Sequence, residues 1–255
     1  MATQPVVLLT SDGDLCRIAA RFLAARFPDL QVIVESRVSR LSLLKRRSKR
    51  LGAVRVAGQA VFWLFAKILH QVSLRRIDDI QRSFGLDPRW PDDHALIKVP
   101  SVNSPECLAH LRRLQPPVVL VIGTRIIERK VLSSIPAPFV NYHDGITPKY
   151  RGIRGGYWAI AGGDLANFGV TIHLVDPGID TGAVLYQTRL APTAKDNYAS
   201  FPYLQIAAAL PLLEKAARDA TAGTLRPQTI DLPSQLWSHP TIWDYVRAGL
   251  RRGAW

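Results

Sequence analysis

Acidic residues are scarce in this chain, and one long stretch has none. The 255 residues include 33 Lys and Arg against 20 Asp and Glu, which gives a formal net charge of +13. No Asp or Glu occurs between Ser36 and Ile77, where eleven cations give a charge of +11. The rest of the chain is therefore close to neutral. An excess of this kind indicates an anionic partner, such as nucleic acid, a phosphorylated substrate or a membrane surface.

Cysteine and long apolar runs are also scarce. Cys16 and Cys107 fit neither a zinc-ligand spacing nor a disulfide framework. The most apolar stretch, Val54–Val72, has eleven uncharged residues between Arg55 and Lys67, short of the roughly twenty that a membrane-spanning helix needs. The N-terminus has no basic region followed by a small-residue cleavage site. We therefore expect a cytoplasmic location and two buried free thiols.

Strand-like and helix-like patterns alternate along the chain. Apolar runs that indicate strands lie at residues 5–10, 31–34, 117–123, 138–143, 169–175 and 183–190. Apolar residues at helical spacing lie at 15–27, 105–114, 156–161 and 198–222. This alternation predicts a Rossmann-like α/β fold, with a mostly parallel central sheet covered by helices on both faces. We expect residues 1–222 to form one catalytic domain and residues 223–255 to be an aromatic tail packed on it.

Residues 36–92 interrupt this alternation, because they are too long for a simple connection between strands. Their composition predicts a basic helical hairpin inserted into the domain. The apolar stretch either packs on the domain, leaving a solvated basic face, or enters a membrane surface. Nucleic-acid binding is the weaker alternative, because the aromatic residues lie in an apolar run and do not alternate with the cations.

Three polar side chains between Val140 and Gly182 are candidate catalytic groups. If residues 139–143 form a strand, Asn141 and His143 face the same side of the sheet. Asp180 follows in a turn marked by Pro and Gly, just after the strand that ends near residue 175. Ligands of open α/β sheets bind beyond the carboxyl ends of the strands, so we expect the three groups to converge there.

A carboxamide, an imidazole and a carboxylate suit acyl transfer to an amine. Asn141 and His143 are candidate donors to the oxyanion of a tetrahedral intermediate. The carboxylate of Asp180 is a candidate acceptor for the proton of the attacking amine, directly or through water. No Ser or Cys lies in a nucleophile-elbow motif, which favours direct transfer over a covalent enzyme intermediate. Nothing in this chemistry requires a metal ion, and no His, Cys and carboxylate cluster indicates one.

Several ordered motifs in this region resemble the formyltransferases that use 10-formyltetrahydrofolate, a family that includes glycinamide ribonucleotide, methionyl-tRNA and amino-sugar formyltransferases. The family pattern is an Asn-x-His, a Pro-x-Tyr-Arg-Gly, a Gly-Val-Thr strand and an Asp-x-Gly-x-Asp-Thr-Gly turn. The matching segments here are Asn141–His143, Pro148–Gly152, Gly169–Thr171 and Asp176–Gly182. The resemblance covers residues 117–222, and it implies that Asn141, His143 and Asp180 are the catalytic residues.

The same resemblance implies a donor pocket and a neighbouring acceptor site. The family's folate pocket corresponds here to Ile122, Gly123, Thr124, Arg125, Ile126 and Ile127, together with Asp176, Gly178 and Ile179. Candidate substrate-binding residues are Asp144, Tyr150, Arg151 and Thr171. For Asp144 and Thr171 the alternative is a purely structural role in a turn or at a strand end, and for Arg151 it is a solvated surface position.

The acceptor amine is inferred by elimination and from the basic insertion. Asp12 and Asp14 follow the first strand, and two carboxylates there would repel the phosphate of glycinamide ribonucleotide. The C-terminal barrel with which methionyl-tRNA formyltransferases help to hold tRNA has no counterpart, so tRNA is not expected as a partner. We predict an amino sugar, nucleotide-linked or lipid-linked. The alternatives are glycinamide ribonucleotide, hydrolysis of 10-formyltetrahydrofolate, and an inactive binding protein tethered through residues 36–77.

Overall fold

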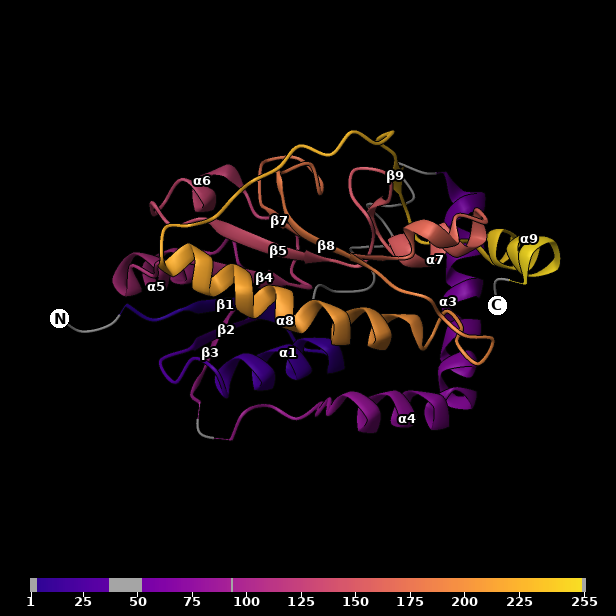
Figure 1. Ribbon diagram of the computed structural model, residues 1–255, viewed down its shortest axis with the longest axis horizontal. Helices are drawn as coiled ribbons and strands as arrows, with labels where there is room; N and C mark the ends of the chain where they lie inside the picture. Colours follow the sequence, from indigo (N-terminus) through magenta and orange to yellow (C-terminus); the bar gives the residue numbers. More distant parts are fainter. Residues whose placement is uncertain (1–3, 37–51, 93, 254–255) are drawn as a thin grey trace.

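The computed structural model describes residues 4–36, 52–92 and 94–253. In this part of the chain a seven-stranded sheet has the order β3-β2-β1-β4-β5-β7-β8 (Figure 1). The strands are β1 (Val7–Ser11), β2 (Gln31–Glu35), β3 (Leu96–Val99), β4 (Val119–Ile122), β5 (Phe139–His143), β7 (Gly169–Leu174) and β8 (Val184–Arg189). The strands from β3 to β5 are parallel, and β7 and β8 each run antiparallel to the preceding strand in that order. The predicted α/β class with a mostly parallel sheet is confirmed.

Two apolar cores lie on the two faces of the sheet, because side chains alternate along each strand. Leu8, Val32 and Val140 face a core that α1 (Asp14–Ala24), α4 (Leu74–Phe84) and α8 (Phe201–Thr221) cover. Figure 1 shows these three helices together along one side of the sheet. Leu9 and Phe139 face a second core, which α5 (Pro105–Leu114) and α6 (Arg129–Leu132) cover. Burial on both faces explains why the central strands are almost continuously apolar.

Most predicted elements appear within a few residues of their predicted bounds. β3, α9 (Ile242–Arg252) and the short elements at residues 129–132, 151–152 and 236–237 were not predicted. β3 is only four residues long, with a half-buried and partly polar pattern. α9 begins with a capping box in which the Thr241 hydroxyl accepts from the Asp244 backbone N–H, and the Asp244 carboxylate accepts from the Thr241 N–H. The usual capping-box signature has Glu or Gln at the third helical position, where this chain has Asp244. Cys16 and Cys107 are buried free thiols, as predicted.

The described part of the 36–92 insertion contains two helices, but they do not form the predicted hairpin. α3 (Ala53–Val72) and α4 meet at Ser73. α4 then runs across one end of α3 and continues beneath the sheet instead of returning along α3 (Figure 1). The reason is that Ile77 and Ile80 of α4 pack into the core beside α1 and α8, whereas α3 packs elsewhere. None of the helices described between residues 4 and 253 is long and apolar enough to cross a membrane.

An aromatic cluster attaches α3 to the C-terminal segment and to α7 (Gly155–Ala161). Phe62 of α3 lies 4.9 Å from Tyr198 and 5.1 Å from Tyr245, measured between ring centroids. Trp158 of α7 stacks on Trp237 of β9 (Leu236–Trp237) at 4.6 Å. β9 pairs with the short strand β6 (Arg151–Gly152). Burial of several large rings makes this cluster a third core.

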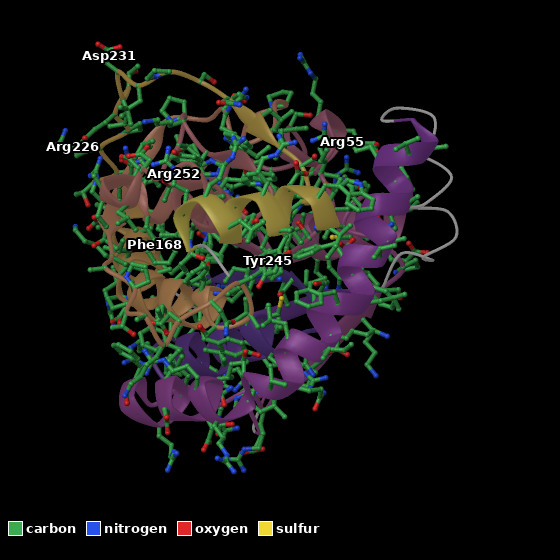
Figure 2. All side chains as sticks on the ribbon, turned by 90° about the vertical axis from the view of Figure 1, so that its right-hand side faces the viewer. Arg55, Phe168, Arg226, Asp231, Tyr245 and Arg252 are labelled. Carbon is green, nitrogen blue, oxygen red and sulfur yellow. The ribbon has the colours of Figure 1, made fainter. Side chains whose placement is uncertain are left out.

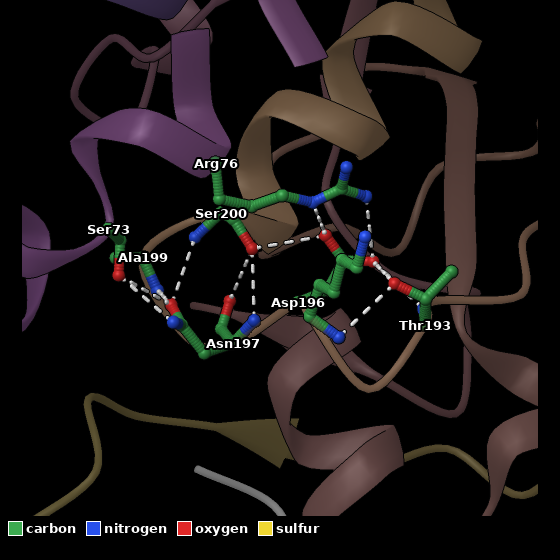
Figure 3. A network of polar contacts seen from close by, with 8 residues as sticks. Ser73, Arg76, Thr193, Asp196, Asn197, Ala199 and Ser200 are labelled. Carbon is green, nitrogen blue, oxygen red and sulfur yellow. Dashed lines mark hydrogen bonds and ion pairs between the residues drawn. The ribbon is translucent and has the colours of Figure 1, made fainter. Parts of the chain in front are cut away.

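A polar network fixes the junction between α3 and α4 to the loop before α8 (Figure 3). Arg76 of α4 forms an ion pair with Asp196, whose side chain is fully buried, at 2.8 Å. Asn197 donates from Nδ2 to the hydroxyl of Ser73 at 2.9 Å. The backbone N–H and the hydroxyl of Thr193 both donate to Asp196. These contacts satisfy the buried carboxylate, whose burial without partners would be costly.

Replacing Phe62 with alanine is expected to destabilise the protein by about 3–5 kcal/mol, because the side chain is 3% exposed and its removal leaves a cavity beside Tyr198 and Tyr245. The matched control is Leu64→Ala in the same helix, since Leu64 is 57% exposed; its effect is expected within about 0.5 kcal/mol. Urea unfolding followed by circular dichroism measures both. Equal losses for the two variants would show that α3 is not packed through Phe62.

Candidate active site

β5 and β7 bring Asn141, His143 and His173 to one face of the sheet. Asn141 is paired with His173 across the two antiparallel strands, and His143 with Thr171. His143 and His173 are both buried. Because side chains alternate along a strand, the expectation that Asn141 and His143 share a face agrees with the structure. Tyr142 and Asp144 point to the opposite face, toward α1 and α8.

Asp180 reaches these residues by a different path from the predicted one. β7 is antiparallel to β5, and Leu174 at its carboxyl end lies beside Val140, near the start of β5. The reasoning that placed Asp180 at the carboxyl edge of a parallel strand is therefore wrong. The loop from 175 to 183 instead folds back, and Gly182 packs so closely on the Leu174 carbonyl that a Cβ atom would lie 1.8 Å from its oxygen. Asp180 itself has a left-handed backbone with φ of 50°.

The Asp180 carboxylate is surrounded by nitrogen atoms. Oδ2 accepts from the backbone N–H of Gly152 at 2.9 Å and lies 3.5 Å from Nδ1 of His143. Oδ1 lies 3.4 Å from Nδ2 of Asn141 and 3.4 Å from Nε2 of His173. Groups from β5, the Gly152 turn and β7 thus meet at the carboxylate that the 175–183 loop carries.

These contacts keep Asp180 ionised although it is largely buried. Burial alone raises the pKa of a carboxyl group. Here the contact with His173, the charge of His143 and the N–H of Gly152 outweigh burial, and the pKa of Asp180 falls from 3.8 to about 2. A buried carboxylate with such a low pKa is a permanent negative charge at neutral pH. It favours positive charge on any group that approaches it.

The backbone contacts of the histidines fix which ring nitrogen carries a proton. Nε2 of His143 lies 2.6 Å from the carbonyl oxygen of Tyr150, so it must donate. Nδ1 of His173 lies 2.8 Å from the carbonyl oxygen of Leu174 and donates likewise. Its Nε2 lies 3.1 Å from Nδ2 of Asn141 and 3.4 Å from Oδ1 of Asp180. His173 therefore contacts both the carboxamide of Asn141 and the carboxylate of Asp180.

The turn after His143 is held by close packing and by buried side chains. A Cβ atom on Gly145 would lie 2.6 Å from the Tyr150 carbonyl oxygen and 2.9 Å from Nε2 of His143. Gln205 of α8 donates from Nε2 to the Asp144 carbonyl at 2.8 Å. The hydroxyl of Thr171 donates to the Gly145 carbonyl at 2.7 Å and accepts from the Thr147 N–H. Gly145 is thus required where backbone and imidazole approach each other.

The four predicted substrate-binding residues have different environments. Thr171 is completely buried and holds the turn, and its contact with substrate stays a prediction. Tyr150 is also buried, and its hydroxyl donates to Asp164 at 2.8 Å; its carbonyl is the part that contacts His143. Arg151 is half-buried and donates to the Ile179 carbonyl at 3.1 Å. Asp144 is half-buried on the other face.

The predicted folate loop after β4 is attached to β2 by a buried ion pair. Glu35 is 4% exposed, and its Oε2 lies 2.6 Å from Nε of Arg125. Its Oε1 accepts from the Arg125 backbone N–H at 2.7 Å. The side chains of Ile122 and Ile127 belong to the two cores, so a contact of these residues with the donor, which stays a prediction, would involve their backbone. Ile126 is exposed.

The other predicted donor-binding residues lie in or beside the two loops. Gly123 has a φ of 66°, and its carbonyl accepts from the Ser11 hydroxyl at 2.8 Å. The Thr124 hydroxyl donates to the Arg125 carbonyl. Asp176 accepts from the Gly178 N–H at 3.0 Å and shapes the turn that presents Asp180. Ile179 is half-buried and Gly178 exposed. Exposed backbone and one apolar side chain on each loop are compatible with a flat heteroaromatic ligand.

Glu35 and His173 were not among the predicted site residues. A single Glu at a strand end carries no local signal. His173 had one available signal: its period-two relation to Thr171 on an apolar strand. No group of three or more His, Cys, Asp or Glu side chains in residues 4–36, 52–92 and 94–253 is arranged to hold a metal ion.

Comparison with known proteins also finds formyltransferases. A family model described as formyl transferase matches residues 92–201. A methionyl-tRNA formyltransferase of Pseudomonas paraeruginosa is 30% identical over 64% of this chain and 53% of its own length. A methionyl-tRNA formyltransferase of Trichlorobacter lovleyi is 37% identical over 38% of this chain and 31% of its own length. The chain thus spans about a third to a half of the length of these curated relatives.

Solved structures share the fold at low sequence identity. A likely sugar N-formyltransferase of Mycobacterium tuberculosis superimposes with a TM-score of 0.59 at 16% identity, over 97% of this chain and 86% of the other. A glycinamide ribonucleotide transformylase of Symbiobacterium toebii gives a TM-score of 0.56 at 16% identity, over 89% and 95%. The predicted Rossmann-like formyltransferase fold is thereby confirmed. The segment of residues 92–201, which carries Asn141, His143 and Asp180, matches the formyl transferase family model and is similar in sequence to methionyl-tRNA formyltransferases.

Proposed function

We propose that this chain transfers a formyl group from 10-formyltetrahydrofolate to a primary amine. The observation that carries the proposal is the ionised, buried Asp180 within 3.5 Å of both His143 and Asn141. Donor use is supported by an N-formyltransferase of Helicobacter canadensis, whose structure contains folinic acid and an aminosugar nucleotide, dTDP-3-aminofucose. The exposed backbone near Ile126 and Gly178 is the proposed donor surface.

Direct transfer requires the amine nitrogen to bond to the formyl carbon while the bond from that carbon to N10 breaks. Asn141 and His143 are proposed to donate to the oxyanion of the tetrahedral intermediate. In the structure the carboxamide of Asn141 donates to Asp180, and Nε2 of His143 donates to the Tyr150 carbonyl. The oxygen of the bound formyl group must therefore replace the present acceptor of one of these N–H groups. Hydrogen bonds of this kind tighten when substrate binds.

Asp180 is proposed to stabilise positive charge and not to retain the transferred proton. With a pKa of about 2 its carboxylate is a weak base, but it attracts the ammonium group that forms when the amine attacks. The proton lost by the amine then passes, directly or through water held at Asp180, to the departing N10. His143, bound to Asp180 on one side and to the Tyr150 carbonyl on the other, keeps this geometry.

An amino sugar, nucleotide-linked or lipid-linked, is the proposed acceptor. The Shewanella sugar N-formyltransferase has a TM-score of 0.58 over 94% of this chain and 78% of its own, which supports the fold but leaves the acceptor a proposal. Glycinamide ribonucleotide remains the second candidate, because the fold of a glycinamide ribonucleotide transformylase covers most of both chains.

Asp180→Asn is expected to lower kcat/KM for formyl transfer by about a hundred- to ten-thousand-fold, because the charge that stabilises the attacking amine is lost. The assay offers 10-formyltetrahydrofolate and a panel of aminosugar nucleotides, with glycinamide ribonucleotide alongside. The control is Asp231→Asn, which removes an exposed carboxylate in the segment after α8 (labelled in Figure 2) and is expected to be fully active.

Binding of 5-formyltetrahydrofolate to the wild type, measured by calorimetry, distinguishes the alternatives. Saturable folate binding, with formyl product from glycinamide ribonucleotide but from no amino sugar, would make glycinamide ribonucleotide the acceptor. Binding with release of formate in the absence of any amine would indicate a hydrolase. No binding at all would remove the folate donor, and a non-enzymatic binding protein would then be the better description.

Acid is expected to remove a stabilising contribution of Asp180 between about pH 4 and pH 2. The folded pKa of about 2 lies below the ordinary 3.8, so the contribution is complete above pH 4 and declines as the pH falls toward 2. The difference corresponds to about 2 kcal/mol. Free energies of unfolding in urea at pH 6, 4, 3 and 2.5, conditions chosen to span roughly this window, should fall more steeply for the wild type than for Asp180→Asn. Parallel curves would contradict a lowered pKa.

A further inference from the structure

α3 buries one side in the aromatic cluster and leaves the opposite side uncovered. Val56, Gly58 and Phe62 face inward. Exposed apolar residues recur every three or four positions, the spacing that defines one helix face. This face, the α3 stripe, consists of Val54, Ala57, Val61, Leu64, Ile68 and Val72. Single exposed apolar residues are common, but a continuous stripe along a helix of twenty residues indicates a contact surface.

α9 extends the uncovered apolar surface. It packs against α3 at Gly58, where a Cβ atom would lie 2.9 Å from Nε1 of Trp243. Trp243, Val246 and Leu250 are all exposed, at the spacing of one helix face. Both helices lie on the side of the molecule that faces the viewer in Figure 2. Two helices that are distant in the sequence and pack together therefore both carry exposed apolar residues.

Cations accompany these apolar residues. Arg55 and Lys67 of α3, Arg75 of α4, and Arg247 and Arg251 of α9 are exposed. α3 itself contains no Asp or Glu. In the sequence, residues 37–51 precede α3 and add seven further Lys and Arg with no acidic residue. Most of the excess positive charge of the protein is thus attached to the helix that carries the apolar stripe.

We propose that the α3 stripe lies on the surface of an anionic lipid bilayer. Such a surface accepts apolar side chains at the boundary between headgroups and acyl chains and attracts cations nearby. Each alternative partner accounts for only one of the two properties of α3, the apolar stripe or the nearby cations. A second copy of the chain would cover the stripe but bring two strongly basic segments together. Nucleic acid would neutralise the cations but leave the stripe in water. The association does not depend on formyl transfer.

Co-sedimentation with vesicles tests the proposal. The full chain is mixed with vesicles of phosphatidylcholine, or of phosphatidylcholine with about a third of phosphatidylserine. Binding is expected only to the anionic vesicles. The double variant L64Q/I68Q is expected to bind at least about tenfold more weakly. Its matched control is F84Q/L165Q, because Phe84 and Leu165 are exposed to a similar extent and lie outside the stripe; it is expected to bind as the wild type.

A charge variant and an oligomer measurement complete the test. K67Q/R75Q is expected to weaken binding to the anionic vesicles, and equal thermal unfolding midpoints establish that each variant is folded. The proposal is overturned if the wild type ignores anionic vesicles, or if L64Q/I68Q binds them as the wild type does. It is also overturned if sedimentation velocity shows a wild-type dimer that L64Q/I68Q converts to monomer, because the stripe would then join two copies.

Discussion

The active-site arrangement depends on one buried negative charge. A carboxylate removed from water has to be compensated where it lies, and Asp180 is compensated by groups from three segments. Gly152 supplies a backbone N–H, β5 supplies Asn141 and His143, and β7 supplies His173. Each of these groups can satisfy Asp180 in one relative placement only. The same requirement that keeps Asp180 ionised therefore fixes the distance between the candidate catalytic side chains, and the geometry of the site follows from the electrostatics of its centre.

Packing outside the site supports this geometry through the Tyr150 carbonyl, which binds Nε2 of His143. The Tyr150 ring stacks near Trp237 at 6.0 Å, and Trp237 stacks on Trp158 of α7. α7 in turn contacts α9, and α9 contacts α3. The insertion and the C-terminal segment are therefore not independent additions to a finished fold. They cover the turn between β5 and α7, and without that cover the turn would expose the rings that hold it.

Local patterns predicted the elements and half of the site. The period of two along residues 139–143 was enough to put Asn141 and His143 on one face, and the turn residues around Asp180 marked a loop. The direction of β7 could not be predicted, because an antiparallel neighbour in a mostly parallel sheet leaves no local signal in an apolar strand. Asp180 was thus assigned correctly to the neighbourhood of His143 on a wrong argument about the sheet edge. The contacts of Glu35 with Arg125 and of His173 with Asn141 depend on strand order and register, which are properties of the assembled sheet. The α3–α4 corner, predicted as a hairpin, depends equally on packing against distant helices.

The distribution of charge bears on how an acceptor would be reached. Outside residues 36–77 the chain is nearly neutral, and the candidate site itself is centred on a carboxylate, so little positive potential is available there to attract a diphosphate. A nucleotide-linked acceptor would have to rely on cations of the insertion, whose strength falls off within about 8 Å at physiological salt. A lipid-linked acceptor does not need this electrostatic attraction. A protein bound to the bilayer through α3 would be confined to the same surface as the acceptor, which raises the effective concentration of the acceptor at the site. The proposed membrane surface therefore favours the lipid-linked form of the amino sugar over the soluble one, although each proposal stands on separate residues.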